Sequence, residues 1–211
     1  MLSLFRKKNR KEFPKWLIEY LALDFSPKRL DHVFTSLDCE TTGLSKTDSI
    51  ITIGAIHCTL TEIYTDSVLD QRFPLRQSGK AAEIHGELSN DTQKHLSDYL
   101  QELICFIENR ILVGHNISFD IGKINQLMQK HYGLKLKNKV LDTADLAIRL
   151  DPITYERTVG GRSKLSLDDL CKKYHIKIEN RHTALGDSFL TAQLLQKLAY
   201  QLERKGIKSI I

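Results

Sequence analysis

Two acidic side chains close together stand out in the stretch Ser36-Leu37-Asp38-Cys39-Glu40-Thr41-Thr42-Gly43. The apolar residues around it predict a β-strand over about residues 33–40. Side chains alternate between the two faces of a strand, so Asp38 and Glu40 project from the same face. Leu37 and Cys39 point to the other. Two neighbouring carboxylates in an apolar strand repel each other unless a partner neutralises them. A divalent cation is such a partner, and a solvated strand end is the alternative that the spacing alone leaves open.

The rest of the chain predicts further strands and a series of helices. Backbone N–H groups in the Thr-Thr-Gly turn lie beside the two carboxylates, where they can hold a polar or anionic ligand. Extended runs at 50–56 and 68–73 come soon after the first strand, which predicts an antiparallel meander. Two more short strands and five helices are expected further on, the strands at 111–113 and 140–142 and the helices near 96–107, 119–132, 143–150, from 165, and around 187–198. Strands that cluster early and then alternate with helices predict an α/β protein with a mixed sheet flanked by helices.

Length and composition favour one globular domain. The chain has 211 residues, of which 41% are apolar and 27% charged, and its formal net charge is +5. The mild positive charge favours an anionic partner without identifying it. Four widely spaced cysteines form no metal-binding or disulfide pattern, so we expect reduced thiols and a cytoplasmic, intracellular protein. No stretch approaches the roughly 18 uninterrupted apolar residues that span a bilayer, so no membrane association is expected.

The N-terminal region differs in character from the rest of the chain. Residues 1–30 contain a basic leader, with five lysines and arginines at 6–11, and then an amphipathic helical pattern after Pro14. We therefore predict an N-terminal leader and amphipathic helix over residues 1–30 and a main domain over residues 31–206. The basic leader is most simply a solvated tail, with an arm for nucleic acid as the alternative.

Two further acidic residues come after strand or turn patterns. Asp120 ends the motif Gly114-His115-Asn116-Ile117-Ser118-Phe119-Asp120, and Asp187 ends His182-Thr183-Ala184-Leu185-Gly186-Asp187. Taken singly, each is most simply a first-turn residue of a helix, favoured there by the helix dipole. Together with the Asp38–Glu40 motif, and in this order, the three motifs resemble those of the DnaQ-like 3′–5′ exonucleases. That family includes the proofreading epsilon subunits of bacterial DNA polymerase III, and the resemblance covers roughly residues 32–200.

The resemblance implies a fold and a set of roles. The family fold is ribonuclease H-like, a five-stranded mixed sheet flanked by helices, with the second strand antiparallel to the others. Asp38, Glu40, Asp120 and Asp187 would bind two divalent cations, Mg²⁺ or Mn²⁺. His182, five residues before Asp187, resembles the general base of the DEDDh subgroup. Such residue types suit phosphodiester hydrolysis, because hard cations prefer oxygen ligands and a histidine can accept a proton near neutral pH.

The resemblance also implies substrate contacts and an activity. Thr41 would hold the terminal 3′-OH, and Leu44, His85 and Phe119 would flank the last nucleotide, although ordinary packing explains Phe119 equally well. We expect a 3′–5′ exonuclease that acts by a two-metal mechanism on the 3′ ends of single-stranded nucleic acid, with DNA the first choice, in proofreading or repair. A DNA polymerase is a candidate partner. An RNA-trimming exoribonuclease and a non-catalytic nucleic-acid-binding module on the same fold are the alternatives.

Overall fold

The computed structural model describes residues 13–26, 33–45, 47–74, 94–152 and 165–207. The strands in these ranges are β1 (Phe34–Thr41), β2 (Ile50–Cys58), β3 (Ile63–Arg72), β4 (Leu112–Gly114) and β5 (Val140–Asp142). The helices are α1 (Lys15–Ala22), α2 (Leu96–Ile107), α3 (Ser118–Tyr132), α4 (Thr143–Leu150), α6 (Leu167–Lys173) and α7 (Ala184–Arg204). The elements keep the predicted order closely, but β3 begins five residues earlier than its apolar run suggested.

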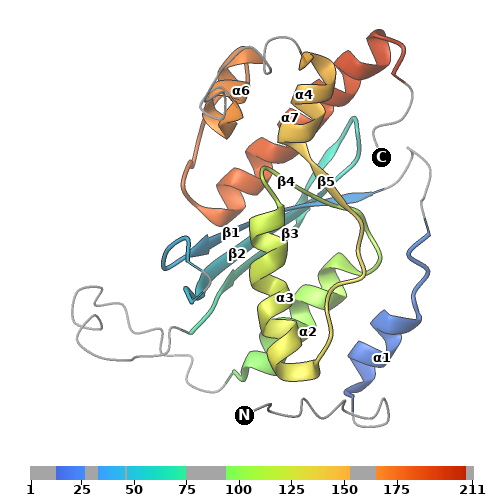
Figure 1. The fold of residues 1–211 in the computed structure, drawn as a ribbon, viewed down its shortest axis with the longest axis vertical. Helices are drawn as coiled ribbons and strands as arrows, with labels where there is room; N and C mark the ends of the chain where they lie inside the picture. Colours follow the sequence, from blue (N-terminus) through green and yellow to red (C-terminus); the bar gives the residue numbers. More distant parts are fainter. Residues whose placement is uncertain (1–12, 27–32, 46, 75–93, 153–164, 208–211) are drawn as a thin grey trace.

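The five strands form one sheet in the order β3-β2-β1-β4-β5. Strand β2 runs antiparallel to both β1 and β3, whereas β4 is parallel to β1 and β5 is parallel to β4. The sheet lies between two groups of helices, with α4, α6 and α7 on one side and α1, α2 and α3 on the other (Figure 1). The structure therefore confirms the predicted α/β architecture, a five-stranded mixed sheet flanked by helices.

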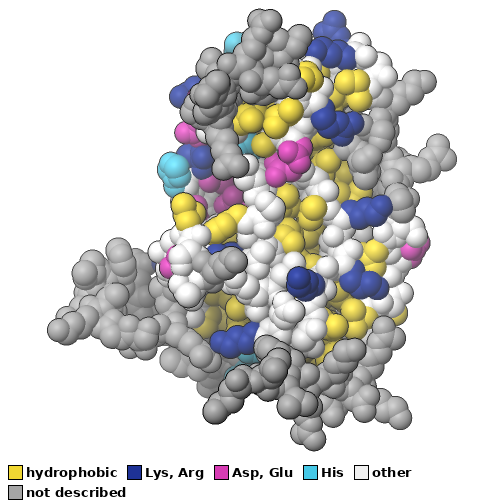
Figure 2. Space-filling model, in the orientation of Figure 1, with side chains coloured by type: hydrophobic (Ala, Val, Ile, Leu, Met, Phe, Trp, Pro, Cys, Tyr) yellow, Lys and Arg dark blue, Asp and Glu magenta, His cyan; other side chains and the backbone are white. Residues whose placement is uncertain are grey.

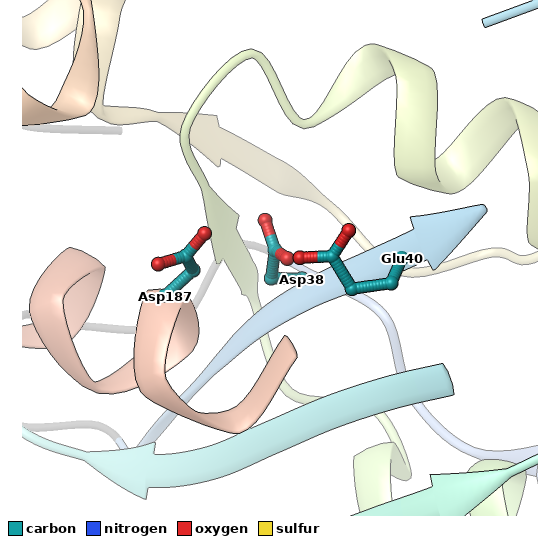
Figure 3. A group of neighbouring side chains, drawn as sticks. All are labelled: Asp38, Glu40 and Asp187. Carbon is teal, nitrogen blue, oxygen red and sulfur yellow. The ribbon is translucent and has the colours of Figure 1, made fainter. Parts of the chain in front are cut away.

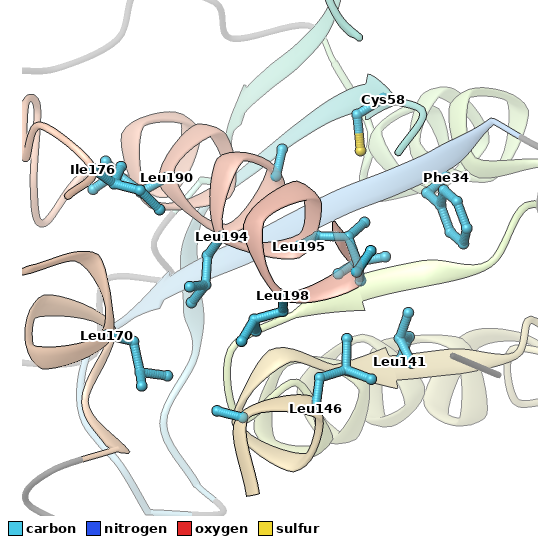
Figure 4. Close-up of a cluster of buried hydrophobic side chains, with 14 of the residues drawn as sticks. Phe34, Cys58, Leu141, Leu146, Leu170, Ile176, Leu190, Leu194, Leu195 and Leu198 are labelled. Atoms are coloured by element: carbon cyan, nitrogen blue, oxygen red, sulfur yellow. The ribbon is translucent and has the colours of Figure 1, made fainter. Parts of the chain in front are cut away.

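The alternation of side chains along β1 separates two hydrophobic cores. Leu37 is fully buried and packs with Cys39 in a core shared with α1, α2 and α3. Phe34 points to the other face and joins a core to which α7 contributes five leucines (Figure 4). Each fully buried leucine contributes about 1.5–3 kcal/mol relative to an exposed one. No helix in the described ranges is long and apolar enough to cross a membrane.

Helix α1 packs onto the end of α3 and onto the segment that comes after it. The Trp16 ring meets the Tyr132 ring edge to face at a centroid distance of 5.5 Å. The Tyr20 hydroxyl donates to Asn138 Oδ1 at 2.7 Å and accepts from the backbone N–H of Lys137 at 2.8 Å. The basic leader lies outside the described residues, and the division of the chain at residue 30 stays a prediction.

Gly54 in β2 lets the start of α7 rest directly on the sheet. A Cβ at this position would lie 2.1 Å from the Leu185 backbone nitrogen and 2.2 Å from the Ala184 carbonyl carbon. Such contacts are far inside van der Waals distance, so any side chain here would push α7 away. Gly54 pairs across the ladder with Asp38. The missing side chain therefore brings the first turn of α7 beside that carboxylate.

The close approach at Gly54 predicts a large effect from a single methyl group. We expect Gly54→Ala to lower the free energy of unfolding by about 1–3 kcal/mol, because the backbone of α7 must shift. Gly122→Ala in α3 is the matched control, since a Cβ there meets nothing within 4 Å. In that control the free energy of unfolding should instead rise by about 0.5–1 kcal/mol, because alanine suits a helix interior better than glycine. Urea unfolding of both variants measures the two effects, and equal stability of Gly54→Ala and wild type would contradict the packing described.

Candidate active site

Three carboxylates from two elements converge beside the central strand of the sheet. Asp38 and Glu40 project from β1, and Asp187 projects from the first turn of α7 (Figure 3). One oxygen of each carboxylate lies within 4.8 Å of the others. Asp187 is buried, and the other two are partly buried. The residues predicted from the first and third motifs therefore meet, although about 150 residues separate them in the sequence.

Local hydrogen bonds fix the start of α7 against β1. The Ser36 hydroxyl donates to the Ser188 carbonyl oxygen at 2.7 Å, and this bond is buried. Thr183 caps the helix, with its side chain accepting from the Gly186 backbone N–H at 3.1 Å. Capping at this position satisfies a backbone donor that the helix itself leaves free. The orientation of Asp187 is therefore set by contacts on both sides of it.

Asp120 approaches the same cluster from α3. It is only 4% exposed, and its Oδ1 accepts a hydrogen bond from the Cys39 backbone N–H at 3.0 Å. The turn that precedes α3 is held by Asp142, whose carboxylate accepts from the backbone N–H groups of Asn116 and Ile117 at 3.0 and 3.1 Å. Asp120 lies outside the group of three carboxylates within 4.8 Å of one another, but it lines the same cleft.

Burial and mutual repulsion make ionisation of these carboxylates unfavourable without a cation. Burial raises the pKa of Asp38 to about 8, and the charges of Asp120, Asp187 and Glu40 add to this effect. Burial likewise raises the pKa of Asp120 to about 7. The pKa of Asp187 is also raised by burial, an effect only partly offset by the neighbouring Arg181 guanidinium. A bound cation would favour the ionised form of all of them.

Arg181 pairs with the cluster, a role that was not predicted from the sequence. Its guanidinium donates from Nη1 to Asp187 and from Nε to Asp168, the first acidic residue of α6. The hydrogen bond from Arg181 lowers the pKa of Asp168. Arg181 directly precedes His182 in the sequence, and this adjacency is the feature that could have indicated its place at the site. Nothing in the local pattern indicated that Asp168 would share the same guanidinium.

His182 lies in the turn between α6 and α7, outside the helix that carries Asp187. Its backbone has a left-handed φ of 63°, and its backbone N–H donates to Asp187 Oδ1 at 3.3 Å. The side chain is exposed and lines the cleft that contains the carboxylates. The backbone of His182 is therefore bonded to the cluster, while its imidazole is accessible to a molecule bound in the cleft.

The carboxylates lie in a cleft of about 1090 Å³. Thr41, Leu44 and Phe119 also line it, and Leu44 is 87% exposed. The space-filling view shows acidic, basic and histidine side chains gathered in a hollow of this face (Figure 2). His85, the remaining predicted substrate contact, lies outside the described residues. The cleft therefore combines acidic and apolar side chains.

The donor set fits a hard divalent cation. Mg²⁺ and Mn²⁺ prefer oxygen ligands, and carboxylates provide both the oxygen and the negative charge. Asp38, Glu40 and Asp187 supply three such groups in reach of one ion. The buried thiol of Cys39 belongs to the opposite face of β1 and packs in the core. The cluster therefore offers the oxygen donors that a hard divalent cation prefers.

Comparisons with known proteins identify the relatives of this chain. Residues 35–195 match the exonuclease family. The DNA polymerase III PolC-type protein of Oceanobacillus iheyensis is 33% identical over 183 residues, which cover 85% of this chain and 12% of that protein. This chain thus corresponds to a small part of that relative.

Solved structures share the fold at low sequence identity. The structure of the yeast NOT1 MIF4G domain co-crystallised with CAF1 contains a similar chain, with a TM-score of 0.60, 12% identity and 79% coverage of both chains. E. coli exonuclease I in complex with a dT13 oligonucleotide has a TM-score of 0.58 and 18% identity, over 83% of this chain and 43% of that one. These likenesses agree with the ribonuclease H-like architecture.

The raised pKa values predict an unusual dependence of stability on pH. When a chelator removes divalent cations, Asp38 in the folded protein keeps its proton up to about pH 8. In the unfolded chain the same carboxyl group loses its proton near its ordinary pKa of 3.8. The free energy of unfolding should therefore fall as pH rises through this window. Asp38→Asn removes this contribution, so its stability relative to wild type should improve steadily with pH in urea titrations.

Added Mn²⁺ should reverse the trend, because the ion binds the ionised carboxylates and stabilises the folded protein more at high pH. A stability difference between wild type and Asp38→Asn that stays constant between pH 4 and 8 would contradict the electrostatic description of the cluster.

Proposed function

This chain belongs to the exonuclease family, and on that basis we propose that it is a cation-dependent 3′–5′ exonuclease of the DEDDh type. Its substrate would be the 3′ end of a single strand of DNA, from which it releases nucleoside 5′-monophosphates. The observation that carries this proposal is the convergence of the Asp38, Glu40 and Asp187 carboxylates in an open cleft, with Asp120 beside them.

Each residue type suits a part of phosphodiester hydrolysis. Asp38, Glu40, Asp120 and Asp187 would hold two Mg²⁺ or Mn²⁺ ions. Such ions, when bound, stabilise negative charge on the attacking and leaving oxygens. His182 would accept the proton of the attacking water, a role that its exposed position at the cleft permits.

The other cleft residues would orient the strand end. The apolar side chains of Leu44 and Phe119 would hold the last base without selecting its identity, because every base presents an apolar face. The backbone of Thr41 and the side chain of His85 would complete the contacts to the terminal nucleotide. These assignments rest on the resemblance of the motifs and on the position of the three described residues along the cleft.

The relatives favour DNA as the substrate. The curated relative is a DNA polymerase III, and the E. coli exonuclease I structure contains a DNA oligonucleotide. A proofreading or repair role beside a DNA polymerase is therefore part of the proposal. Oligomers of RNA test the exoribonuclease alternative, because a protein distinguishes the two through the 2′-hydroxyl.

A cleavage assay tests the proposed activity. Purified protein with Mg²⁺ or Mn²⁺ should shorten a 5′-labelled single strand from its 3′ end, and chelator should stop it. His182→Ala should lower kcat by about 10²–10⁴-fold through loss of the base. Asp38→Ala should lower it at least about 10²-fold through loss of a cation ligand.

Asp66→Ala serves as the control, since it removes an exposed carboxylate of β3 and should leave the rate unchanged. Intact strands in the presence of both cations would favour a non-catalytic binding module. A near-wild-type rate for His182→Ala or Asp38→Ala would refute the role given to that residue.

A further inference from the structure

Lys123 of α3 is a buried lysine that takes no part in the mechanism above. It is 4% exposed, and its Nζ donates to the carbonyl oxygens of Ser45 and Asp48 at 2.6 and 2.7 Å. Lysine is rarely buried without such partners, because removal of the ammonium from water is costly. Lys123 therefore joins α3 firmly to the connection between β1 and β2.

That connection, which we call the rim turn (residues 42–49, all described except 46), is held together from within. The Asp48 carboxylate accepts from the Ser45 backbone N–H at 2.6 Å and from the Thr42 hydroxyl at 3.1 Å. The Thr42 N–H donates to the Ser49 carbonyl oxygen at 3.0 Å. These bonds make the described part of the rim turn a compact unit, and Lys123 attaches it to α3.

The rim turn and α3 form two walls of the cleft. Leu44 belongs to the rim turn and Phe119 to α3, and both line the cleft. Leu44 is 87% exposed, so core packing does not fix its position. Lys123 lies one helical turn after Phe119, with its Nζ 5.4 Å from the Phe119 ring centroid. The Lys123 ammonium thus contacts both walls of the cleft, the rim turn through two carbonyl oxygens and α3 through the Phe119 ring.

We propose that Lys123 is a positioning residue that holds the rim turn against α3 and so sets the width of the slot for the terminal nucleotide. The proposal rests on the proposed exonuclease function. Lys123 donates to backbone groups of the rim turn and not to the carboxylate cluster, so its loss should weaken substrate binding and leave the chemical step intact. A role in stability alone would leave substrate binding unchanged.

Lys123→Met, which keeps the side-chain length and removes the charge and the donors, tests this role. We expect KM for a single-stranded DNA end to rise about tenfold, as for loss of hydrogen bonds to a charged group, with kcat within about twofold of wild type. Lys123→Arg keeps the charge and donors and should restore most of the affinity. Lys130→Met, an exposed lysine of the same helix, is the matched control and should have no effect.

Amide hydrogen exchange, measured without substrate, reports on the rim turn itself. Exchange at Leu44, Ser45 and Asp48 should be faster in Lys123→Met than in wild type. Faster exchange together with a raised KM supports the proposal, and an unchanged KM or unchanged exchange overturns it. Asp48→Ala opens the same turn without altering α3, and it replaces Lys123→Met if that variant does not fold. Absence of cleavage by the wild type overturns the proposed function instead, so the two failures are distinguishable.

Discussion

The approach of α7 to the sheet at Gly54 is the constraint on which the candidate active site depends. Asp38 and Asp187 can share a cation only if the first turn of α7 lies against the centre of β1 and β2. A side chain on the sheet at this point would separate them, and glycine leaves the space open. The buried bond from Ser36 to the Ser188 carbonyl then fixes the helix laterally. The chemistry of the site is thus a consequence of helix-on-sheet packing.

The same packing creates an electrostatic cost that the structure moderates in several ways. Asp120 and Asp187 both lie in first turns, where the positive ends of α3 and α7 face the cluster. The Cys39 backbone N–H binds Asp120, and Arg181 pairs with Asp187. These partners reduce the repulsion without removing it, because the pKa of Asp38 remains at about 8. The remaining imbalance favours a divalent cation over a further hydrogen bond.

Much of this architecture could be predicted from the sequence, because local patterns determine it. The alternation along β1 placed Asp38 and Glu40 on one face, and the helix over residues 143–150 was predicted with its observed bounds. The early start of β3 was missed because Thr65, Asp66 and Ser67 interrupt the apolar pattern between Ile63 and Val68 in this edge strand. The Arg181 pairs, the burial of Lys123 and the role of Gly54 depend on contacts between distant segments. No local periodicity reports such contacts, so these features required the three-dimensional structure.

The position of α7 has one more consequence, which concerns how freely the side chains of the site move in the native state. Asp187 lies in the first turn of a helix whose leucines pack in one core, and the Thr183 cap and the bond from Ser36 to Ser188 hold that turn, so its carboxylate has little freedom to leave the cluster. His182 precedes that helix in a short exposed turn and can swing out at little cost. A restrained carboxylate and an exposed imidazole therefore lie only five residues apart. Thermal fluctuations of the native state should therefore move the histidine side chain more readily than the carboxylate.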